Sequence, residues 1–359
     1  MKAISLFSGV GGDTLGMTRA GVEVVAFSEN NRHAIETHRA NFPHSTLLEY
    51  KGSTDIRDIP DEVLGEYKVD IIFAGFPCQG FSHAGKKNPR DPRNELVYEF
   101  VRATRCIQPT YIIGENVKGL LERKTPQGLP VIHIIEQLFS EIGYILTWRV
   151  CNAVDFGVPQ KRERLILLGA KTRVEWSPVL HFVPQSPYFL TLRDCIEPTL
   201  EGAVEYKGDP TGITWLRIDK NIFPSGKPHP NLVRLLEGKR GLTPAERKNS
   251  DEKIVIEDKP LLSFGKRASS YHGEILNLDK PCKTIICSYQ SCPRLFVGLT
   301  TGEKYYVRTL TIQELARIQG FPDDFNFHGS GIITQIGNAV PPPLVEGVLR
   351  KMILSQAKG

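Results

Sequence analysis

The sequence predicts an α/β fold built around a mostly parallel sheet. Residues 1–170 alternate short runs rich in β-branched and aromatic residues with amphipathic helical patterns, which is typical of consecutive βαβ units. Residues 69–74 (VDIIFA) form a continuous apolar run, as expected for a strand buried on both faces of a sheet. Of the 359 residues, 40% are apolar and 24% are charged, which is the composition of a globular chain and excludes a disordered or fibrous one.

The individual elements follow from the same patterns. Strands are expected at 3–7, 22–28, 69–74, 111–114, 144–150 and 164–169, and helices at 12–20, 32–41, 95–107, 129–142, 311–319 and 344–355. Thr311 is a good N-cap for the helix that follows it. From residue 176 to 230, Pro, Gly and Asp are frequent and no period is sustained, which indicates a domain boundary followed by a loop-rich region.

The cysteine content and the apolar runs indicate a soluble protein of the cytosol. Seven cysteines, an odd number, are scattered through the chain, which favours reduced thiols. No uncharged apolar run approaches the ~18 residues that a membrane-spanning helix needs. The first residues turn to Gly and Asp too early for a secretory signal.

The positive charge is concentrated in one region. The chain has 45 Lys and Arg against 40 Asp and Glu, and residues 205–304 hold 17 of the former and 12 of the latter. The net charge of +5 therefore lies entirely in this window. Such an excess fits a phosphate-binding surface, although an ordinary solvated surface has similar composition.

Glycines separate the first expected strand from the first helix, where backbone amides are free to bind a ligand. Counted from Gly9, the dinucleotide fingerprint Gly-x-Gly-x-x-Gly fails because Thr14 occupies the third glycine position. Glu29 follows 20 residues after Gly9, where a carboxylate can accept both ribose hydroxyls. The pattern suits binding of a nucleoside such as S-adenosylmethionine. The alternative is that the glycine-rich segment is a turn with only a structural role.

Three polar positions lie at the ends of other expected strands. Cys78 is in a Gly/Pro/Ser loop and not in an apolar run, which favours a reactive thiol over a small buried side chain. Glu115 ends the strand 111–114 and is a candidate proton donor, or otherwise a surface acid or helix cap. Arg162 and Arg164 are two residues apart, so in a strand their side chains lie on the same face. The alternative is that they are ordinary charged residues at the start of a strand.

Taken together and in order, six segments resemble the motif series of the DNA (cytosine carbon-5) methyltransferases. These are FSGVGG (7–12), PCQ (77–79), ENV (115–117), QKRER (160–164), RTLTIQELARIQGFP (308–322) and QIGNAVP (335–341). The resemblance covers residues 1–170 and 308–345 and implies a Rossmann-like, mostly parallel, S-adenosylmethionine-dependent methyltransferase domain. It implies that residues 1–175, completed by 328–359, bind the cofactor and that residues 176–327 form a smaller target-recognition domain.

The resemblance implies a covalent mechanism, because carbon-5 of cytosine is a poor nucleophile. The thiolate of Cys78 would attack carbon-6 while Glu115 protonates ring nitrogen 3. Arg164 would contact the cytosine carbonyl oxygen, and Arg162 would face an anion, either a phosphate or the thiolate. The base must be flipped out of the duplex, with the loop 80–93 closing over the DNA.

The resemblance also assigns the cofactor site. Its residues are Phe7, Gly9, Val10, Gly11, Glu29, Asn30, Asp55, Ile56, Pro77, Leu96, Asn338 and Val340. Glu29 would take the ribose, and Asp55 would accept from the adenine amino group. At Asn30 some relatives have a tryptophan that stacks on adenine, so this contact would come from elsewhere, such as Phe7 or Ile56.

For DNA contacts, the candidates lie in or next to the loop 80–93 and in the basic region 205–304. They are Gln79, Ser82, Lys86, Lys87, Lys266, Arg267, Thr284, Ile285, Gln290 and Arg294. Thr284 and Ile285 match a short Thr-hydrophobic signature that supports the backbone of the flipped nucleotide. Three cysteines at 282, 287 and 292 lack a His pair, so no metal site is expected.

The expected partner is duplex DNA, and no membrane association is expected. The protein is expected to be a monomer that binds DNA of the nucleoid transiently. A restriction–modification role is expected, with a cognate endonuclease that acts on the same site without stable binding. One alternative is an RNA (tRNA) cytosine methyltransferase. Its relatives carry a Cys-Phe-Thr signature in the recognition region, and no Cys in this sequence is followed by Phe-Thr. Another alternative is an inactive DNA-binding regulator. A cysteine hydrolase is a third, but no His has a motif-level pairing with Cys78.

Overall fold

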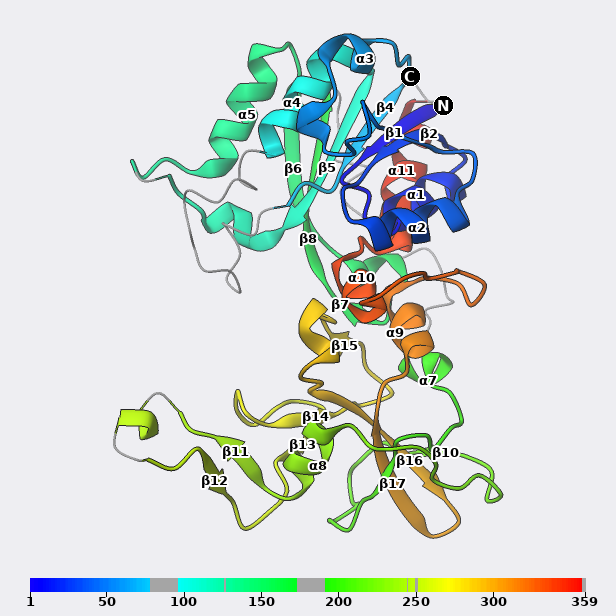
Figure 1. Ribbon diagram of the computed structural model, residues 1–359, viewed down its shortest axis with the longest axis vertical. Helices are drawn as coiled ribbons and strands as arrows, with labels where there is room; N and C mark the ends of the chain where they lie inside the picture. The colour runs from blue at the N-terminus through cyan, green and yellow to red at the C-terminus, as the bar shows by residue number, and fades with distance from the viewer. Residues whose placement is uncertain (78–95, 126, 173–190, 244, 249–250, 357–359) are drawn as a thin grey trace.

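Two sheets lie at opposite ends of the long axis of the chain, which is represented by a computed structural model (Figure 1). The structure describes residues 1–77, 96–125, 127–172, 191–243, 245–248 and 251–356. Both termini lie at the end that holds the larger sheet (Figure 1). Among the described residues, no helix has both the length and the apolar character needed to cross a bilayer.

The larger sheet has seven strands and confirms the predicted mostly parallel α/β architecture. In spatial order they are β3 (Thr46–Leu47), β2 (Glu23–Ser28), β1 (Lys2–Leu6), β4 (Ile71–Ala74), β5 (Tyr111–Val117), β8 (Glu163–Ala170) and β6 (Ile145–Asn152). Of these, β8 runs antiparallel to both of its neighbours, and the other pairings are parallel. The carboxyl ends of β1, β2, β4 and β5 therefore meet at one edge.

Helices cover both faces of this sheet. They are α1 (Gly12–Arg19), α2 (Arg32–Asn41), α3 (Asp61–Gly65), α4 (Leu96–Ile107), α5 (Val131–Glu141) and α11 (Pro342–Gln356). Side chains alternate along β4: Ile71 and Phe73 pack in the core beneath α1 and α11, whereas Ile72 packs in the core beneath α4 and α5. The last helix of the chain thus completes the layer begun by the first.

One strand is longer than its apolar pattern predicts. The sequence indicates a strand at 111–114, but β5 continues to Val117. Its extension pairs with β8, with Glu115 opposite Ile166 and Val117 opposite Arg164. This pairing supplies the backbone hydrogen bonds that hold polar residues in a strand, and it places Glu115 within β5 instead of after it.

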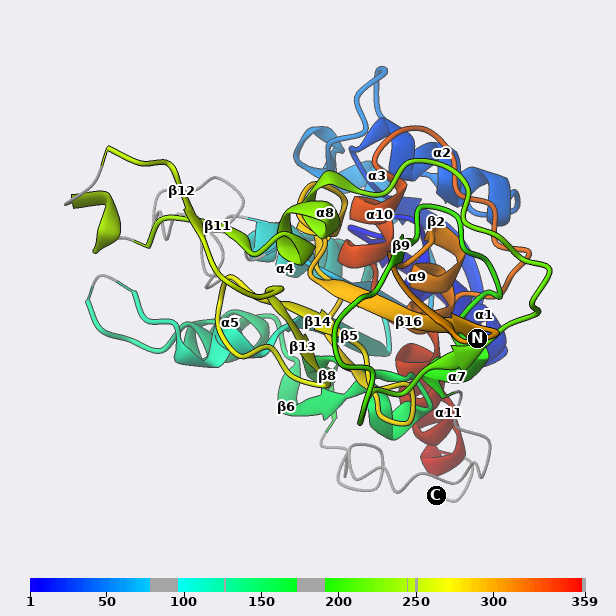
Figure 2. The same cartoon turned by 90° about the horizontal axis from the view of Figure 1, so that it is seen from below.

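The smaller sheet lies in the second half of the chain. Its strands are β9 (Val204–Glu205), β10 (Leu216–Arg217), β13 (Leu262–Phe264), β14 (Gly273–Ile275), β16 (Leu295–Thr301) and β17 (Lys304–Thr309). The short helices α7 (Leu192–Cys195) and α8 (Pro230–Leu236) accompany it. A ribbon of β11 (Lys239–Gly241) and β12 (Ile254–Ile256) extends away from it (Figures 1 and 2). The loop-rich interpretation of residues 176–230 agrees with the short strands described from 191 onward.

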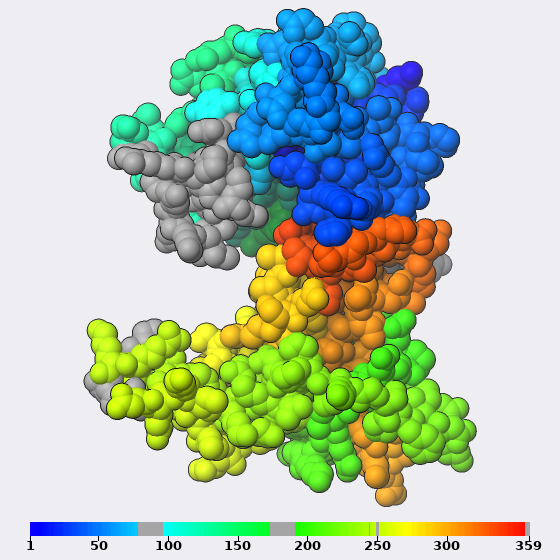
Figure 3. Space-filling model, in the orientation of Figure 1, coloured from blue at the N-terminus to red at the C-terminus, as the bar shows by residue number. Residues whose placement is uncertain are grey.

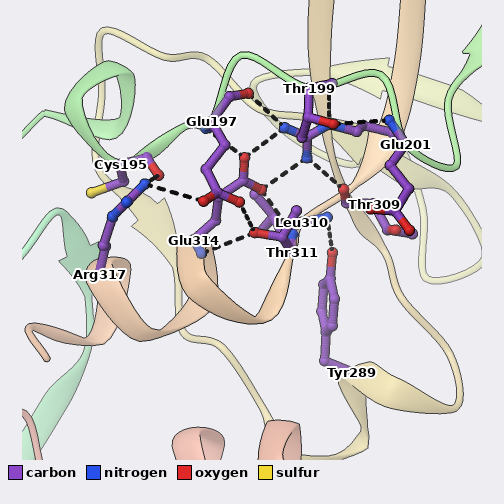
Figure 4. Close-up of polar contacts among 11 residues, drawn as sticks. Cys195, Glu197, Thr199, Glu201, Tyr289, Thr309, Leu310, Thr311, Glu314 and Arg317 are labelled. Atoms are coloured by element: carbon purple, nitrogen blue, oxygen red, sulfur yellow. Dashed lines mark hydrogen bonds and ion pairs between the residues drawn. The ribbon is translucent and has the colours of Figure 1, made fainter. Parts of the chain in front are cut away.

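Two connections tie the sheets together. The strand β7 (Gln160–Lys161), just before β8, pairs with β15 (Cys282–Lys283) from the second half. After β17, the chain enters α9 (Ile312–Gln319), whose N-cap is Thr311, as predicted, and Thr311 also forms a capping box with Glu314. Glu314 also binds Arg308 of β17, and backbone carbonyls of Glu197 and Thr199 accept hydrogen bonds from the same guanidinium (Figure 4). Buried polar groups thus join β17, α9 and the segment after α7.

Candidate active site

A pocket of about 700 Å³ lies at the edge where the carboxyl ends of β1, β2, β4 and β5 meet. Its lining includes the ends of these strands and residues between 330 and 340, which lie just before, within and just after α10 (Ile332–Asn338). In Figure 3 the surface is hollowed between the part that carries the large sheet and the part that carries the small one. Ligands of open α/β sheets bind beyond such strand ends, so this edge is the candidate site.

The glycine-rich turn after β1 forms one wall. Gly9 lines the pocket with φ 56°, a left-handed conformation, and no atom lies within 4 Å of the position of an added Cβ. Gly11, also left-handed at φ 89°, does not line the pocket. A Cβ there would lie 2.5 Å from the ring of Phe42, so the role of Gly11 in this structure is close packing. Phe7 and Val10 do line the pocket, as expected.

Glu29 occupies the end of β2 beside this turn. Its carboxylate accepts hydrogen bonds from the backbone amides of Gly9 (2.9 Å), Asn30 (2.9 Å) and Asn31 (2.8 Å). Burial raises the pKa of this carboxyl above its ordinary value, while the three amides oppose the shift. The side chain is therefore fixed at the pocket wall and keeps further acceptor lone pairs for a ligand hydroxyl.

Asp55 and Ile56 form the neighbouring wall. The Asp55 side chain caps a 3₁₀ turn (Ile56–Asp58), and Arg57 pairs with it at 2.5 Å. The Arg57 guanidinium lowers the pKa of the Asp55 carboxyl. Ile56 is buried and offers an apolar surface in the pocket. An acidic acceptor beside an apolar face is suited to the edge and face of a purine.

Further lining residues come from distant parts of the sequence. Pro77 and Leu96 line the pocket together with Asn338 and Val340. The carbonyl of Val340 approaches Gly12 so closely that no side chain could replace the glycine. Two segments more than 300 residues apart therefore meet over the first turn of α1. The structure thus places every predicted cofactor residue except Gly11 on one cavity.

Glu115 and Arg164 lie in the same pocket. Arg164 Nε and Glu115 Oε1 are 2.8 Å apart, and their side chains are 12% and 11% exposed, so both retain an open face. Asn116, the next residue of β5, donates from Nδ2 to the carbonyl of Phe76 at 3.0 Å. This bond holds the chain two residues before Cys78, which itself lies outside the described residues.

Arg162 lines the pocket but is engaged differently from Arg164. Its side chain is fully buried, and its two terminal nitrogens donate to the carbonyls of Ile285, Gly337 and Ala339. Burial lowers the pKa of this guanidinium well below its usual range. Only Nε has no hydrogen-bond partner in the described part of the chain, so little of the group is left to face an anion.

The candidate DNA residues separate into three groups. Gln79, Ser82, Lys86 and Lys87 lie outside the described residues, as does the loop 80–93. Lys266 and Gln290 are exposed, whereas Arg267, Thr284 and Arg294 are half-buried. Ile285 is fully buried, its amide donates to Gln160 Oε1, and its carbonyl binds Arg162, so it has no surface to offer DNA. Thr284 beside it donates to the carbonyl of Lys161 at 2.8 Å.

Sequence reasoning missed Asp13, which also lines the pocket. The carboxylate accepts hydrogen bonds from the hydroxyls of Ser5 and Ser8, and burial raises the pKa of Asp13 to about 6. Ser8 continues the chain of contacts to Thr14, whose hydroxyl meets His38 Nε2 at 3.0 Å. An acid in the first turn of a helix resembles ordinary capping, so only the buried hydroxyls around it reveal its position beneath the glycine turn.

Comparison with known proteins identifies relatives along nearly the whole chain. The family model described as C-5 cytosine-specific DNA methylase matches residues 1–354. The Type II methyltransferase M1.HphI of Haemophilus parahaemolyticus is 32% identical over 98% of this chain and 86% of its own length. M.PspPI of a Psychrobacter species, also a Type II methyltransferase, is 34% identical over 98% and 78%. The S. pombe Dnmt2 methyltransferase, 15% identical, shares the fold with a TM-score of 0.62 over 100% of this chain and 99% of that one.

Proposed function

Because the chain belongs to the C-5 cytosine-specific DNA methylase family, we propose that it methylates a flipped cytosine through a covalent adduct with Cys78. The protein is an S-adenosylmethionine-dependent DNA methyltransferase. The proposal concerns its mechanism, its site residues and its biological setting. The observation that supports it most is that Glu29, Glu115 and Arg164 open into one pocket, which brings a nucleoside-binding wall next to an acid–cation pair.

The pocket residues fit S-adenosylmethionine. The fixed carboxylate of Glu29 suits ribose hydroxyls, and the amide-bearing turn around Gly9 permits close approach of the methionine part. Asp55 and Ile56 suit the adenine. We assign the wall of Pro77, Leu96, Asn338 and Val340 to the side near the sulfonium. When bound, the cofactor supplies the methyl group that carbon-5 receives.

The remaining chemistry is assigned to the protein side chains. The Cys78 thiolate adds to carbon-6, the electron pair of the ring double bond moves toward carbon-5 and ring nitrogen 3, and Glu115 delivers a proton to that nitrogen. After methylation, loss of the carbon-5 proton expels the thiolate, and ring nitrogen 3 returns its proton to the Glu115 carboxylate, which restores the neutral aromatic ring. Arg164 stabilises charge at the carbonyl oxygen. Because Arg164 and Glu115 hold each other at 2.8 Å, entry of the base exchanges this ion pair for two contacts with cytosine.

The DNA would lie in the hollow between the two sheets. Residues 176–327 would read the target, and residues 1–175 with 328–359 would carry out catalysis. Lys266, Arg267, Gln290 and Arg294 are assigned to DNA contacts, with the cations on phosphates. Unstacking the target base costs a few kcal/mol, which contacts from both parts must offset.

The biological setting follows from the relatives. Two of the relatives compared above, M1.HphI and M.PspPI, are Type II methyltransferases, so we assign this enzyme to a restriction–modification system. It would act as a monomer on chromosomal DNA in the cytoplasm. A cognate endonuclease would cut the same site when unmethylated, without stable binding to the methyltransferase.

Bisulfite sequencing tests the proposal directly. DNA from a methylation-deficient host that expresses the protein should carry 5-methylcytosine at one recurrent sequence, and a Cys78→Ser host should carry none. An in vitro assay with that duplex and with tRNA separates the two substrate classes. Methylation of tRNA alone, or full activity of the Cys78→Ser variant, would contradict the proposal.

A further inference from the structure

Arg162 lies at the meeting point of three chain segments. Nη1 donates to the carbonyl of Ile285 at 3.2 Å, and Nη2 donates to Gly337 at 2.9 Å and to Ala339 at 3.0 Å. Among the described residues, the hydrogen-bond acceptors of its guanidinium are backbone carbonyls. A fully buried guanidinium held by carbonyls depends on all three segments staying in place, because each lost bond leaves a buried polar group unsatisfied.

Neighbouring polar side chains strengthen the same junction. Gln160, also fully buried, accepts from the Ile285 amide and donates to Gln319 Oε1 at 2.7 Å. Gln319 in turn donates to the carbonyl of Ala339 at 2.6 Å. The Ile285 and Ala339 segments are therefore joined by two parallel routes, one through Arg162 and one through the two glutamines.

The two ends of this junction face different ligands in the proposed function. Ile285 follows Thr284 and precedes the 3₁₀ turn η7 (Cys287–Gln290), in the part assigned to DNA. Gly337 and Ala339 flank Asn338, which lines the cofactor pocket. η7 packs directly on α10, since Thr334 donates to the Cys287 carbonyl at 3.2 Å.

We infer that Arg162 is a positioning residue that couples DNA binding near Thr284 to the wall of the cofactor pocket at Asn338. In a close-packed interior, a shift of the Ile285 carbonyl either breaks its bond to Arg162 or carries the Gly337–Ala339 segment with it. Coupling of this kind is reciprocal: DNA tightens cofactor binding by the same factor by which cofactor tightens DNA binding. The inference rests on the proposed function.

Calorimetry with S-adenosylhomocysteine, with and without the target duplex, measures the coupling. In the wild type we expect the duplex to tighten binding by about fivefold or more. In Arg162→Lys, which keeps the charge but loses the forked geometry, the ratio should fall below the wild-type value, because only the route through the two glutamines remains. The matched control Arg164→Lys should keep the wild-type ratio while its kcat falls. An unchanged ratio in Arg162→Lys, or no coupling in the wild type, would overturn the inference.

A measurement on the wild type alone keeps the inference testable if Arg162→Lys does not fold. Amide hydrogen exchange in residues 332–341 should slow when the duplex is added without cofactor. Unchanged exchange there would overturn the coupling, while methyl transfer by the same protein preparation, measured after S-adenosylmethionine is added, would stay intact. Absence of methyl transfer after that addition would instead contradict the proposed function, and the inference would be lost with it.

Discussion

Arg308 and Glu314 form an ion pair in which neither side chain has any exposed surface, with Nη2 and Oε1 2.6 Å apart. Arg308 is the second-last residue of β17, and Glu314 lies in the first turn of α9. The remaining donors of the guanidinium bind the carbonyls of Glu197, Thr199 and Thr309. Every nitrogen of Arg308 is therefore satisfied, which is the condition under which a buried charge is tolerated.

Removing one partner of this pair should destabilise the protein strongly. Arg308→Met leaves the Glu314 carboxylate buried without its cation, for which we expect a loss of about 3–5 kcal/mol in the free energy of unfolding. The double variant Arg308→Met/Glu314→Leu removes both charges and should lose less. Urea denaturation of both variants measures this. A double variant less stable than the single one would contradict the interpretation.

The stability of the protein should depend on pH through Asp13. Its pKa is raised from 3.8 to about 6 by burial, so the folded state binds more protons than the unfolded state between these values. Stability from this group is therefore present at low pH and lost as pH rises, by about 2 kcal/mol between pH 4 and 7.5. Asp13→Asn removes this loss.

Unfolding free energies of wild type and Asp13→Asn across that range provide the check. The variant should gain on the wild type steadily as pH rises toward 6 and then run parallel to it. Curves that are parallel throughout would show that Asp13 is not the titrating group.

Loss of the Glu115 acid should lower kcat but should still allow Cys78 to form its covalent bond to cytosine. Glu115→Gln cannot deliver the proton to ring nitrogen 3, so kcat should fall by about 10²–10⁴-fold. A duplex with 5-fluorocytosine at the target traps the adduct, because the fluorine cannot leave as a cation. With the methyl donor present, the wild-type protein should become covalently attached to this duplex. Glu115→Gln should become attached slowly, and Cys78→Ser should not become attached. Denaturing gels would show the attached species. Attachment of Cys78→Ser would refute the assigned nucleophile.

Glu29 should contribute mainly to cofactor affinity. Glu29→Ala removes charge-assisted hydrogen bonds worth about 1.5–3 kcal/mol, so the Kd for S-adenosylmethionine should rise by about 10- to 100-fold. Glu29→Gln keeps the shape and one acceptor oxygen and should lose less. Calorimetry compares the three proteins, and an unchanged Kd for Glu29→Ala would exclude the ribose role.

The sequence by itself determined the α/β class and most of the strands and helices in residues 1–170, although the short helix α3 was not expected. Periodicity reports which face of an element is buried, and parallel strands carry the residues at their ends to one edge. The set of pocket residues was expected from the resemblance to the methyltransferase motifs. The helix expected at 32–41 has those bounds, and Glu29, Asp55 and Glu115 line the same cavity.

Only the tertiary structure decided what depends on contacts between distant segments. It extended β5 through Glu115 by pairing with β8, and it committed Arg162 to carbonyls 123–177 residues away instead of to an anion. It also buried Ile285 and placed Asp13 beneath the glycine turn. The physical reason is that a buried polar group must find a partner wherever the packed chain supplies one, and local sequence periodicity carries no information about which distant segment that is.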